Sequence, residues 1–371
     1  MTHSEHLSKV IGEVIAPAAR QVDREGKFPR EGLNALGSAG ILGLTVPAEH
    51  GGGGKGLAEA ADAVEQVARA CGSTAMILMM HYAATAVLAA HGPASVLTDI
   101  AAGRHLSTLA FSEVGSRSHF WAPVSTADAD GDSVVLNARK SWVTSAGQAD
   151  SYVWSSRPVA ADGPMTLWLV PSQSPGLSIP AAFDGLGLRA NASSPVSADS
   201  VRVPGGARLG DDGGGLDIAF ATALPFFLIL NAAASVGLME AVIEATAAHL
   251  VMTKLEHLNQ TLADQQSARA GLAQMRITAD SARTLLNDAI SALGAGRPDA
   301  QLRLLEVKAA AAEASIQVTD LAMTVCGGSA FRTDLGIERR FRDARAARVM
   351  APTTEALHDF IGRALCGLPL M

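Results

Sequence analysis

Residues 132–156, DSVVLNARKSWVTSAGQADSYVWSS, decide the fold class, because they contain short runs rich in Val, Thr and Trp that turn-forming residues interrupt. Two similar runs lie on either side, STLAFS at 107–112 and MTLWLVP at 165–171. The sequences DADGD and VAADGP mark turns between such runs. This pattern predicts a central domain of short β-strands from about residue 106 to residue 210.

Helices are predicted on both sides of this central domain, because apolar residues recur there at helical spacing. The segments with this pattern are 4–22, 57–70, 74–90, 216–253, 262–293, 299–326 and 353–365. The last four, three long and one short, indicate an antiparallel bundle. We therefore expect an α+β multidomain protein with a helical domain at 1–105, a β domain at 106–210 and a helical bundle at 211–371.

Residues 46–56, VPAEHGGGGKG, contain four consecutive glycines. Such a run can cradle a phosphate group when a strand precedes it and a GK[ST] sequence and a helix follow. That context is missing here, so we interpret the run as a flexible linker.

The hydrophobic content is high, at 48% of 371 residues with a mean hydropathy of +0.22. No uninterrupted apolar stretch is long enough to span a bilayer, because His81 interrupts 75–90, and Pro225 and Asn231 interrupt 219–236. We expect helices buried on most faces and a homo-oligomer, either a homodimer or a homotetramer, rather than a membrane protein.

Charge and cysteine content indicate a cytoplasmic protein that does not bind nucleic acid. The net charge is −7 and no basic stripe is present. The first residues, MTHSEHLSKVIGEV, lack the basic and apolar regions of a secretion signal. The three cysteines are scattered and form no CxxC pair, so we expect neither a disulfide framework nor a metal site.

Five strings, taken in order, resemble the acyl-CoA dehydrogenases over nearly the whole chain. They are FPREGLNALGSAGILGLTVPAEHGGG at 28–53, KSWVTSAGQAD at 140–150, GLGLRANAS at 185–193, SVRVPGGARLG at 200–210 and CGGSAFRTDLGIERRFRDARAARV at 326–349. The resemblance implies an N-terminal helical domain, a central β-barrel-like domain and a C-terminal four-helix bundle.

The resemblance also implies an FAD site. Phe111 and Ser112, in the AFSE string, match residues that contact the flavin, and Trp142, Val143 and Thr144 match the strand that flanks its ring system. An indole can pack on such a ring, and a hydroxyl or N–H can bond its polar edge. Trp142 could instead be a core residue of the sheet.

Four more residues match family positions near the cofactor, namely Gly327, Gly328, Thr353 and Arg363. Thr353 could equally be a helix N-cap, and both roles are compatible because a helix N-terminus attracts anions. Arg363 could equally be a solvated charge on the last helix.

The catalytic acid of the family is missing from this sequence. Family dehydrogenases remove the substrate α-proton with a glutamate, because the base must be ionised at neutral pH, while the flavin accepts the β-hydride. The motif Y-E-G-T-[ST]-[QE] reads MAPTTE at 350–355, which places Ala351 at the glutamate position. Some members carry the base on an earlier helix, and the matching position here falls near Phe227.

Two further departures concern the cofactor and the substrate. The family string R-x-x-F-G, whose arginine pairs with the FAD pyrophosphate, is replaced by TKLEHLN at 253–259, where Lys254 could supply one positive charge but not a planar fork. The family string T-E-P-x-x-G-S-D is replaced by SEVGSRSHFW at 112–121. That loop keeps a family serine at Ser118 and introduces larger or more polar residues.

Three residues are the candidates for relocated catalysis, namely His119, Ser118 and Glu355. An imidazole can titrate near neutrality, which makes His119 the first of them, although it could be an exposed turn residue. Glu355 lies one helical turn beyond Ala351. His81 is a further candidate, with a hydrogen-bonded core residue as the alternative.

Three functions remain open. The first is an FAD-dependent oxidoreductase of acyl-CoA dehydrogenase type that acts on an acyl thioester or related small molecule with relocated catalytic residues. The second is a flavin-dependent monooxygenase on the same fold, which needs no α-proton base and is served by a flavin reductase or another electron-transfer partner. The third is a non-catalytic subunit that pairs with an active homologue.

Overall fold

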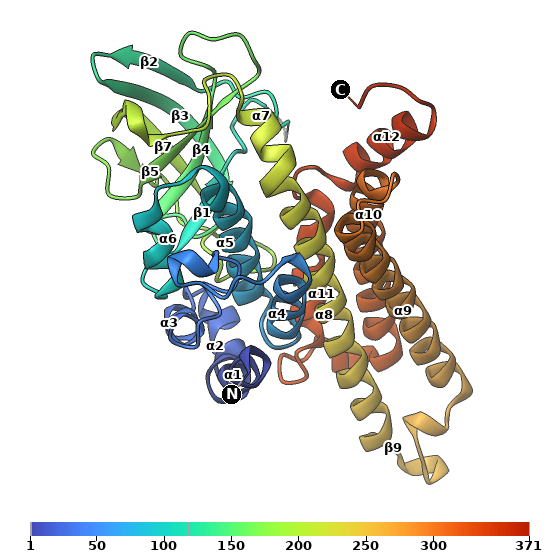
Figure 1. Cartoon of the computed structure of the whole chain (residues 1–371). Coiled ribbons are helices and arrows are strands. Elements are labelled where there is room, and N and C mark those ends of the chain that lie inside the picture. The colour runs from blue at the N-terminus through green and yellow to red at the C-terminus, as the bar shows by residue number, and fades with distance from the viewer. Residues whose placement is uncertain (1, 117–118, 371) are drawn as a thin grey trace.

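The computed structural model describes residues 2–116 and 119–370, which form a group of N-terminal helices, a β domain and a C-terminal helical bundle (Figure 1). The N-terminal helices are α1 (His3–Val10), α2 (Ala16–Glu25), α3 (Arg30–Ser38), α4 (Leu57–Ala70), α5 (Gly72–His91) and α6 (Ala94–Ala101). A π-helical stretch joins α1 to α2. The sequence pattern does not predict α3 and α6, which are only eight or nine residues long.

The β domain consists of two four-stranded sheets that pack around a shared core. Its strands are β1 (Ser107–Ala110), β2 (Thr126–Asp130), β3 (Ser133–Val143), β4 (Ser151–Ser156), β5 (Thr166–Pro171), β6 (Leu177–Ser178), β7 (Ser194–Pro204) and β8 (Arg208–Leu209). The order is β1-β4-β5-β8 in one sheet and β2-β3-β7-β6 in the other. Among the strands named here, β1 and β4 pair in parallel and the remaining pairs are antiparallel.

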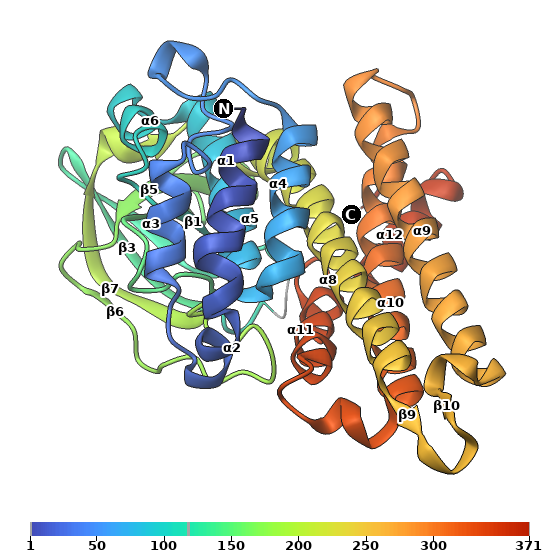
Figure 2. The ribbon, with the colours of Figure 1, turned by 90° about the horizontal axis from the view of Figure 1, so that it is seen from below.

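The C-terminal part begins with the short helix α7 (Figure 1) and continues through long antiparallel helices (Figure 2). Its elements are α7 (Gly215–Ile218), α8 (Leu224–Met252), the β9–β10 hairpin (Lys254–Leu255 and Gln260–Thr261), α9 (Gln266–Gly294), α10 (Ala300–Cys326), α11 (Ile337–Val349) and α12 (Thr354–Leu365). The apolar spacing in the sequence does not predict α11, because this helix contains five arginines and few large apolar residues.

Helix α5 occupies the centre of the molecule and packs against α4, α8 and β1. Two helical stretches, Gly72–His91 and Gly215–Met252, are long and apolar enough to cross a membrane by composition, yet 83% and 89% of their most apolar windows are buried inside the protein. Both stretches therefore serve as core helices in this fold.

The glycine run after residue 50 is packed rather than flexible, so the linker interpretation was wrong. A Cβ atom on Gly52 would lie 2.2 Å from the Val46 carbonyl oxygen, and one on Gly53 would lie 2.7 Å from that of Leu44. The Lys55 N–H also donates to the Leu44 carbonyl, at 3.0 Å. The glycines are required because two backbone segments approach too closely for side chains.

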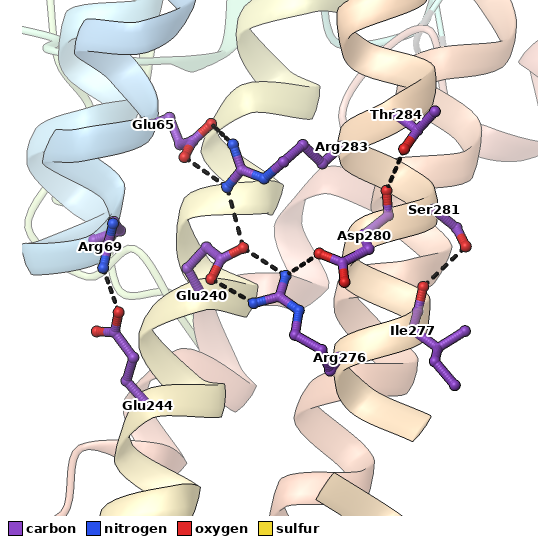
Figure 3. Close-up of polar contacts among 10 residues, drawn as sticks. All are labelled: Glu65, Arg69, Glu240, Glu244, Arg276, Ile277, Asp280, Ser281, Arg283 and Thr284. Carbon is purple, nitrogen blue, oxygen red and sulfur yellow. Dashed lines mark hydrogen bonds and ion pairs between the residues drawn. The ribbon is translucent and has the colours of Figure 1, made fainter. Parts of the chain in front are cut away.

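A network of ion pairs joins α4, α8 and α9 (Figure 3). The Arg283 guanidinium donates to Glu65 at 2.8 and 3.0 Å and to Glu240 at 3.1 Å. The Arg276 guanidinium donates two hydrogen bonds to Glu240, at 2.6 and 2.8 Å. Because Glu240 accepts from both arginines, these hydrogen bonds hold the pKa of its carboxyl at about 2, below the ordinary 4.5, despite partial burial.

Replacement of Glu240 with glutamine is expected to destabilise the fold by about 2 kcal/mol at neutral pH, because hydrogen bonds to a charged group are lost. The lowered pKa means that the carboxylate stabilises the folded state above pH 4.5 and that this contribution is lost as the pH falls towards about 2. Urea unfolding from pH 7 to pH 2 should therefore show a smaller loss of stability in E240Q than in the wild type. Parallel curves for the two proteins would contradict this role of Glu240.

Candidate functional site

A pocket lies where the three parts of the chain meet. The β domain contributes Phe111, Ser112, Ser141 and Trp142 to its wall. Helix α5 contributes Met80, α8 contributes Leu224 and Phe227, and the segment between α11 and α12 contributes Ala351 and Pro352. Residues that are far apart in the sequence therefore enclose one space.

Trp142 is exposed and backbone-strained at the mouth of this pocket. Its side chain is 71% exposed, and its φ of 56° is unusual for a bulky residue. Such strain persists where the surrounding structure enforces it, commonly at functional sites. Trp142 also lines an adjoining hollow, which shares Ser112 and Ser141 with the pocket. The structure thus excludes the sheet-core alternative for Trp142.

The next two residues, Val143 at the end of β3 and Thr144 in the following turn, point away from the pocket. Val143 is buried in the core between the two sheets, and the Thr144 hydroxyl lies 3.1 Å from the Ser193 hydroxyl. Their side chains do not line the wall, so any contact that they make with a cofactor would come from the backbone.

Both positions at which the family carries its acid face the same pocket. Phe227 and Ala351 line it together with Trp142, and no residue in this lining, as far as the structure describes it, has an ionisable side chain. The polar groups of the lining are the hydroxyls of Ser112 and Ser141, together with backbone atoms. No side chain in the described wall can therefore act as a base toward a ligand.

The predicted catalytic residues do not line this wall. His119 is exposed, its Nδ1 lies 2.9 Å from the Ser116 carbonyl oxygen, and its ring packs edge-on against Trp121 at 5.0 Å. Glu355 is exposed in the first turn of α12. Ser118 lies outside the described residues. The catalytic role of these three residues stays a prediction.

Aromatic contacts connect the substituted loop to the pocket and to α12. Phe120 lines the pocket and packs against Phe111 at 6.3 Å and Phe220 at 6.4 Å. Trp121 packs against Phe360 of α12 at 5.4 Å. The large residues in this loop therefore reinforce one wall of the pocket.

His81 is a hydrogen-bonded core residue. Its Nδ1 accepts from the Ser107 N–H at 3.1 Å, and its Nε2 lies 3.1 Å from the Leu42 carbonyl oxygen. Burial lowers its pKa to about 4, so the ring is neutral at neutral pH. The geometry therefore gives no support to His81 as a candidate catalytic residue.

Thr353 lies beside the pocket, whereas Arg363 lies at the other end of its helix. The Thr353 hydroxyl caps α12 by accepting from the Ala356 N–H at 3.3 Å, directly after Ala351 and Pro352 of the wall. The Arg363 Nε donates to the Pro369 carbonyl at 2.6 Å, so this arginine is used to hold the end of the chain.

Gly327 and Gly328 lie far from the pocket of their own chain. They follow α10, whose Lys308 contacts the 350–352 segment beside the pocket. At 1.5 Å per residue along a helix, the glycines lie roughly 28 Å from Lys308. A single chain therefore does not bring these glycines together with Trp142.

A buried ion pair, whose Glu113 belongs to the lining of the adjoining hollow, was not recognised from the sequence. The Lys140 ammonium, 0% exposed, donates to Glu113 Oε1 at 2.5 Å and to the Ser155 carbonyl at 2.7 Å. Glu113 Oε2 accepts from the N–H groups of Val124 and Ser125 at 2.6 and 2.9 Å. The pair thereby fixes both ends of the loop that carries Phe120.

The pKa values of this pair reflect a competition between burial and attraction. Burial lowers the pKa of Lys140 to about 8 against the pull of Glu113. Burial alone would raise the pKa of Glu113, but the ammonium and the hydrogen bonds hold it below its ordinary value. Both groups are charged at neutral pH. The signal in the sequence was the presence of both residues inside the quoted AFSE and KSWVTS strings.

Comparison with known proteins agrees with this architecture. Models of the N-terminal, middle and C-terminal domains of acyl-CoA dehydrogenase match residues 3–98, 108–201 and 213–366. The chain is 30% identical to the probable acyl-CoA dehydrogenase YngJ of Bacillus subtilis, over 95% of this chain and 93% of that protein. It is 29% identical to the human mitochondrial short-chain specific acyl-CoA dehydrogenase, over 91% of this chain and 83% of that protein.

A solved structure has the same fold. Butyryl-CoA dehydrogenase from Megasphaera elsdenii superposes with a TM-score of 0.91 at 23% identity and covers 99% of both chains. The fold and the site thus define a flavin-dependent oxidoreductase. The chain belongs to the acyl-CoA dehydrogenase family, and its cofactor is FAD.

The residues that line the pocket and the adjoining hollow fit this cofactor. The exposed indole of Trp142 offers a flat apolar surface, and the hydroxyls of Ser112 and Ser141 offer polar contacts beside it. We infer that these residues hold the ring system. FAD, when bound, supplies two-electron redox chemistry at this place.

Replacement of Trp142 with alanine is expected to weaken FAD binding about tenfold, because aromatic packing contributes on the order of 0.5–1.5 kcal/mol beyond area burial. The measurement is a fluorescence titration of the apoprotein with FAD. Trp142→Phe, which keeps an aromatic face, is the matched control and should bind FAD nearly as well as the wild type. An unchanged dissociation constant in W142A would remove Trp142 from the cofactor site.

Proposed function

We propose that this protein is an FAD-dependent oxidoreductase that acts on a thioester with a compact, uncharged acyl group, or on a related small molecule, without an acid or base in the pocket. Flavin-dependent monooxygenation is the reaction that this geometry favours. One observation carries the proposal: Trp142, Phe227 and Ala351 line a single pocket whose described lining contains no ionisable side chain. A monooxygenase needs no α-proton base, whereas a dehydrogenase of this family does.

The residues of the pocket have separate tasks in this proposal. Met80, Leu224 and Phe227 give the deep wall an apolar surface that excludes water and favours an apolar acyl group. Phe111 and Phe120 close another side with aromatic rings. A substrate carrying a carboxylate or an ammonium would find no counter-charge in this lining and would have to lose its hydration.

The second candidate is a dehydrogenase with non-standard catalytic residues. Similarity to acyl-CoA dehydrogenases over 95% of the chain favours it. In that case the proton must leave through a group that does not line the described pocket, such as His119 or Glu355. The pocket and the adjoining hollow that meet at the exposed Trp142 favour a cofactor-binding protein over a non-catalytic subunit.

A homo-oligomer, a dimer or a tetramer, is also proposed. Gly327 and Gly328 cannot reach the pocket of their own chain, so a cofactor contact would require a second copy. Phe331, in the same segment, is 81% exposed, as expected for a residue that another copy covers. Electrons would come from a flavin reductase in the monooxygenase, or leave through an electron-transfer partner in the dehydrogenase.

Two measurements on the FAD-loaded protein separate these functions. The protein is first mixed anaerobically with a panel of short acyl-CoA thioesters while the absorbance of oxidised flavin is recorded. In a second experiment the reduced protein meets isotopically labelled oxygen and the same thioesters. We expect no bleaching in the first and labelled product in the second. Rapid bleaching would favour the dehydrogenase, and failure to bind FAD would contradict both.

A further inference from the structure

A buried lysine lies behind the pocket wall, and the reaction proposed above does not involve it. Lys308 lies on α10 and is 0% exposed. Its Nζ donates to the Met350 carbonyl at 2.7 Å and to the Pro352 carbonyl at 2.6 Å. These two carbonyls flank Ala351, and both Ala351 and Pro352 form part of the pocket lining. The ammonium therefore holds the wall from behind.

The wall depends on such a contact because it contains no regular structure. The segment 350–353 joins the end of α11 at Val349 to the start of α12 at Thr354. At its two ends, the Met350 N–H donates to Ala346 and the Thr353 carbonyl accepts from Leu357. Between these points, the two hydrogen bonds from Lys308 fix the direction of the chain. A shift of this segment would change the space between Ala351 and Trp142.

Lys308 has no acidic partner in the described part of the chain. Its two hydrogen bonds go to carbonyl oxygens, and no ion pair with a carboxylate is present there. Burial lowers the pKa of Lys308 to about 7, and burial is the cause of this shift. An uncompensated buried ammonium is costly, so its position directly behind Ala351 indicates a specific task.

Among the described residues, no charged group on the helices packed against α10 forms an ion pair with Lys308. Helix α8 has no charged residue from Leu224 to Met239, and Asp288 of α9 is paired with Arg297 at 2.6 Å. On α11, Arg345 is paired with Asp320 and Arg348 is exposed. The remaining titratable groups on α10 and α12 near this level are Arg303, Glu306, Glu313, Glu355, His358 and Asp359. Of these, Arg303 pairs with Glu306 at 2.8 Å, and His358 lies 3.9 Å from Glu313.

We propose that Lys308 is a positioning residue, whose charged amine fixes the Met350–Pro352 wall and thereby sets the ligand affinity and the flavin potential of the site. This proposal rests on the pocket being the active site, as proposed above. The ammonium form makes the stronger hydrogen bonds to the two carbonyls. As the pH rises above about 7, the amine loses its proton, the wall is held less firmly and ligand affinity falls. The lost positive charge also makes the flavin potential more negative.

The test compares four full-length, FAD-loaded proteins: the wild type, Lys308→Met, Lys308→Arg and Lys9→Met. Lys9 is exposed on α1, so its replacement removes one charge without touching the pocket. Butyryl-CoA is the probe, and its dissociation constant is measured from pH 6 to pH 9 beside the thermal unfolding midpoint. We expect at least tenfold weaker binding in K308M at pH 6.5 and no pH dependence around pH 7. K308R should restore tight binding, and K9M should match the wild type.

A merely structural lysine would give a different pattern. K308M would then unfold at a lower temperature, yet bind butyryl-CoA with the affinity and pH dependence of the wild type while folded, and this result would overturn the proposal. If K308M does not fold, the absence of any change in wild-type affinity around pH 7 would overturn it equally.

The flavin midpoint potential separates this inference from the proposed function. It requires only FAD binding, so it can be measured even if butyryl-CoA fails to bind the wild type. A more negative potential in K308M, and a potential in K308R close to that of the wild type, would support the positioning role whatever the substrate is. Equal potentials in all four proteins would contradict it.

Discussion

Replacement of Ala351 with glutamate is expected to raise acyl-CoA dehydrogenase activity roughly 10²–10⁴-fold above the wild type, which is the usual contribution of a positioned general base. Ala351 lines the same pocket as Trp142, so a carboxylate at this position would face a ligand that lies against the flavin. The Lys308 ammonium behind this segment would favour its ionised form. The measurement is the anaerobic rate at which butyryl-CoA bleaches the oxidised flavin.

Ala351→Gln is the matched control, because glutamine has nearly the same size and shape but cannot accept the proton. The A351E rate should increase with pH as the carboxyl group ionises, whereas A351Q should stay at the wild-type level throughout. If A351E binds FAD and butyryl-CoA but reduces the flavin no faster than A351Q, the missing acid is not what separates this chain from a dehydrogenase.

Replacement of Lys140 with methionine is expected to destabilise the protein by about 3–5 kcal/mol, because it leaves the Glu113 carboxylate buried without its partner. The two side chains are 0% and 1% exposed, so water cannot replace the ammonium. Urea unfolding at pH 7 measures the loss. The cost should diminish in acid, because protonation of Glu113 removes the unpaired charge.

The double variant Glu113→Gln with Lys140→Met is the control for this effect. It removes both charges while retaining similar volumes, so it should recover most of the stability that K140M loses. A double variant as unstable as K140M would show that the lost hydrogen bonds of Lys140 to Ser155, rather than the unpaired charge, determine the cost.

Local sequence patterns were sufficient for much of the fold and for the front of the site. Helix α4 was predicted with its observed limits, Leu57–Ala70, because its apolar residues recur at helical spacing. Phe111, Ser112 and Trp142 were identified because short strings around them resemble the acyl-CoA dehydrogenases, and the structure brings them to one pocket. The absence of an acid at Ala351 and Phe227 was visible only through the family resemblance.

Other features depend on contacts between distant segments, which periodicity does not reveal. Lys140 and Lys308 are ordinary basic residues in the sequence, and only the fold shows that both are buried. Gly52 and Gly53 were interpreted as flexible because nothing local shows the backbone of 44–46 that lies against them. Gly327 and Gly328 lie far from the pocket because α10 is long. The sequence predicted the length of this helix, but not that the helix separates the two glycines from the pocket.

The central position of α5 has a consequence for how the molecule unfolds. This helix is in contact with α4 and α8, and with β1 of the β domain, and nearly all of its side chains are buried. Loss of any one partner would expose a largely apolar cylinder to water, which makes partly unfolded forms costly. The three parts of the chain should therefore behave as a single cooperative unit, with one denaturation transition rather than three. A fragment that ends before α8 would lack a surface that α5 needs, so the domain boundaries seen in the sequence do not mark independently folding pieces.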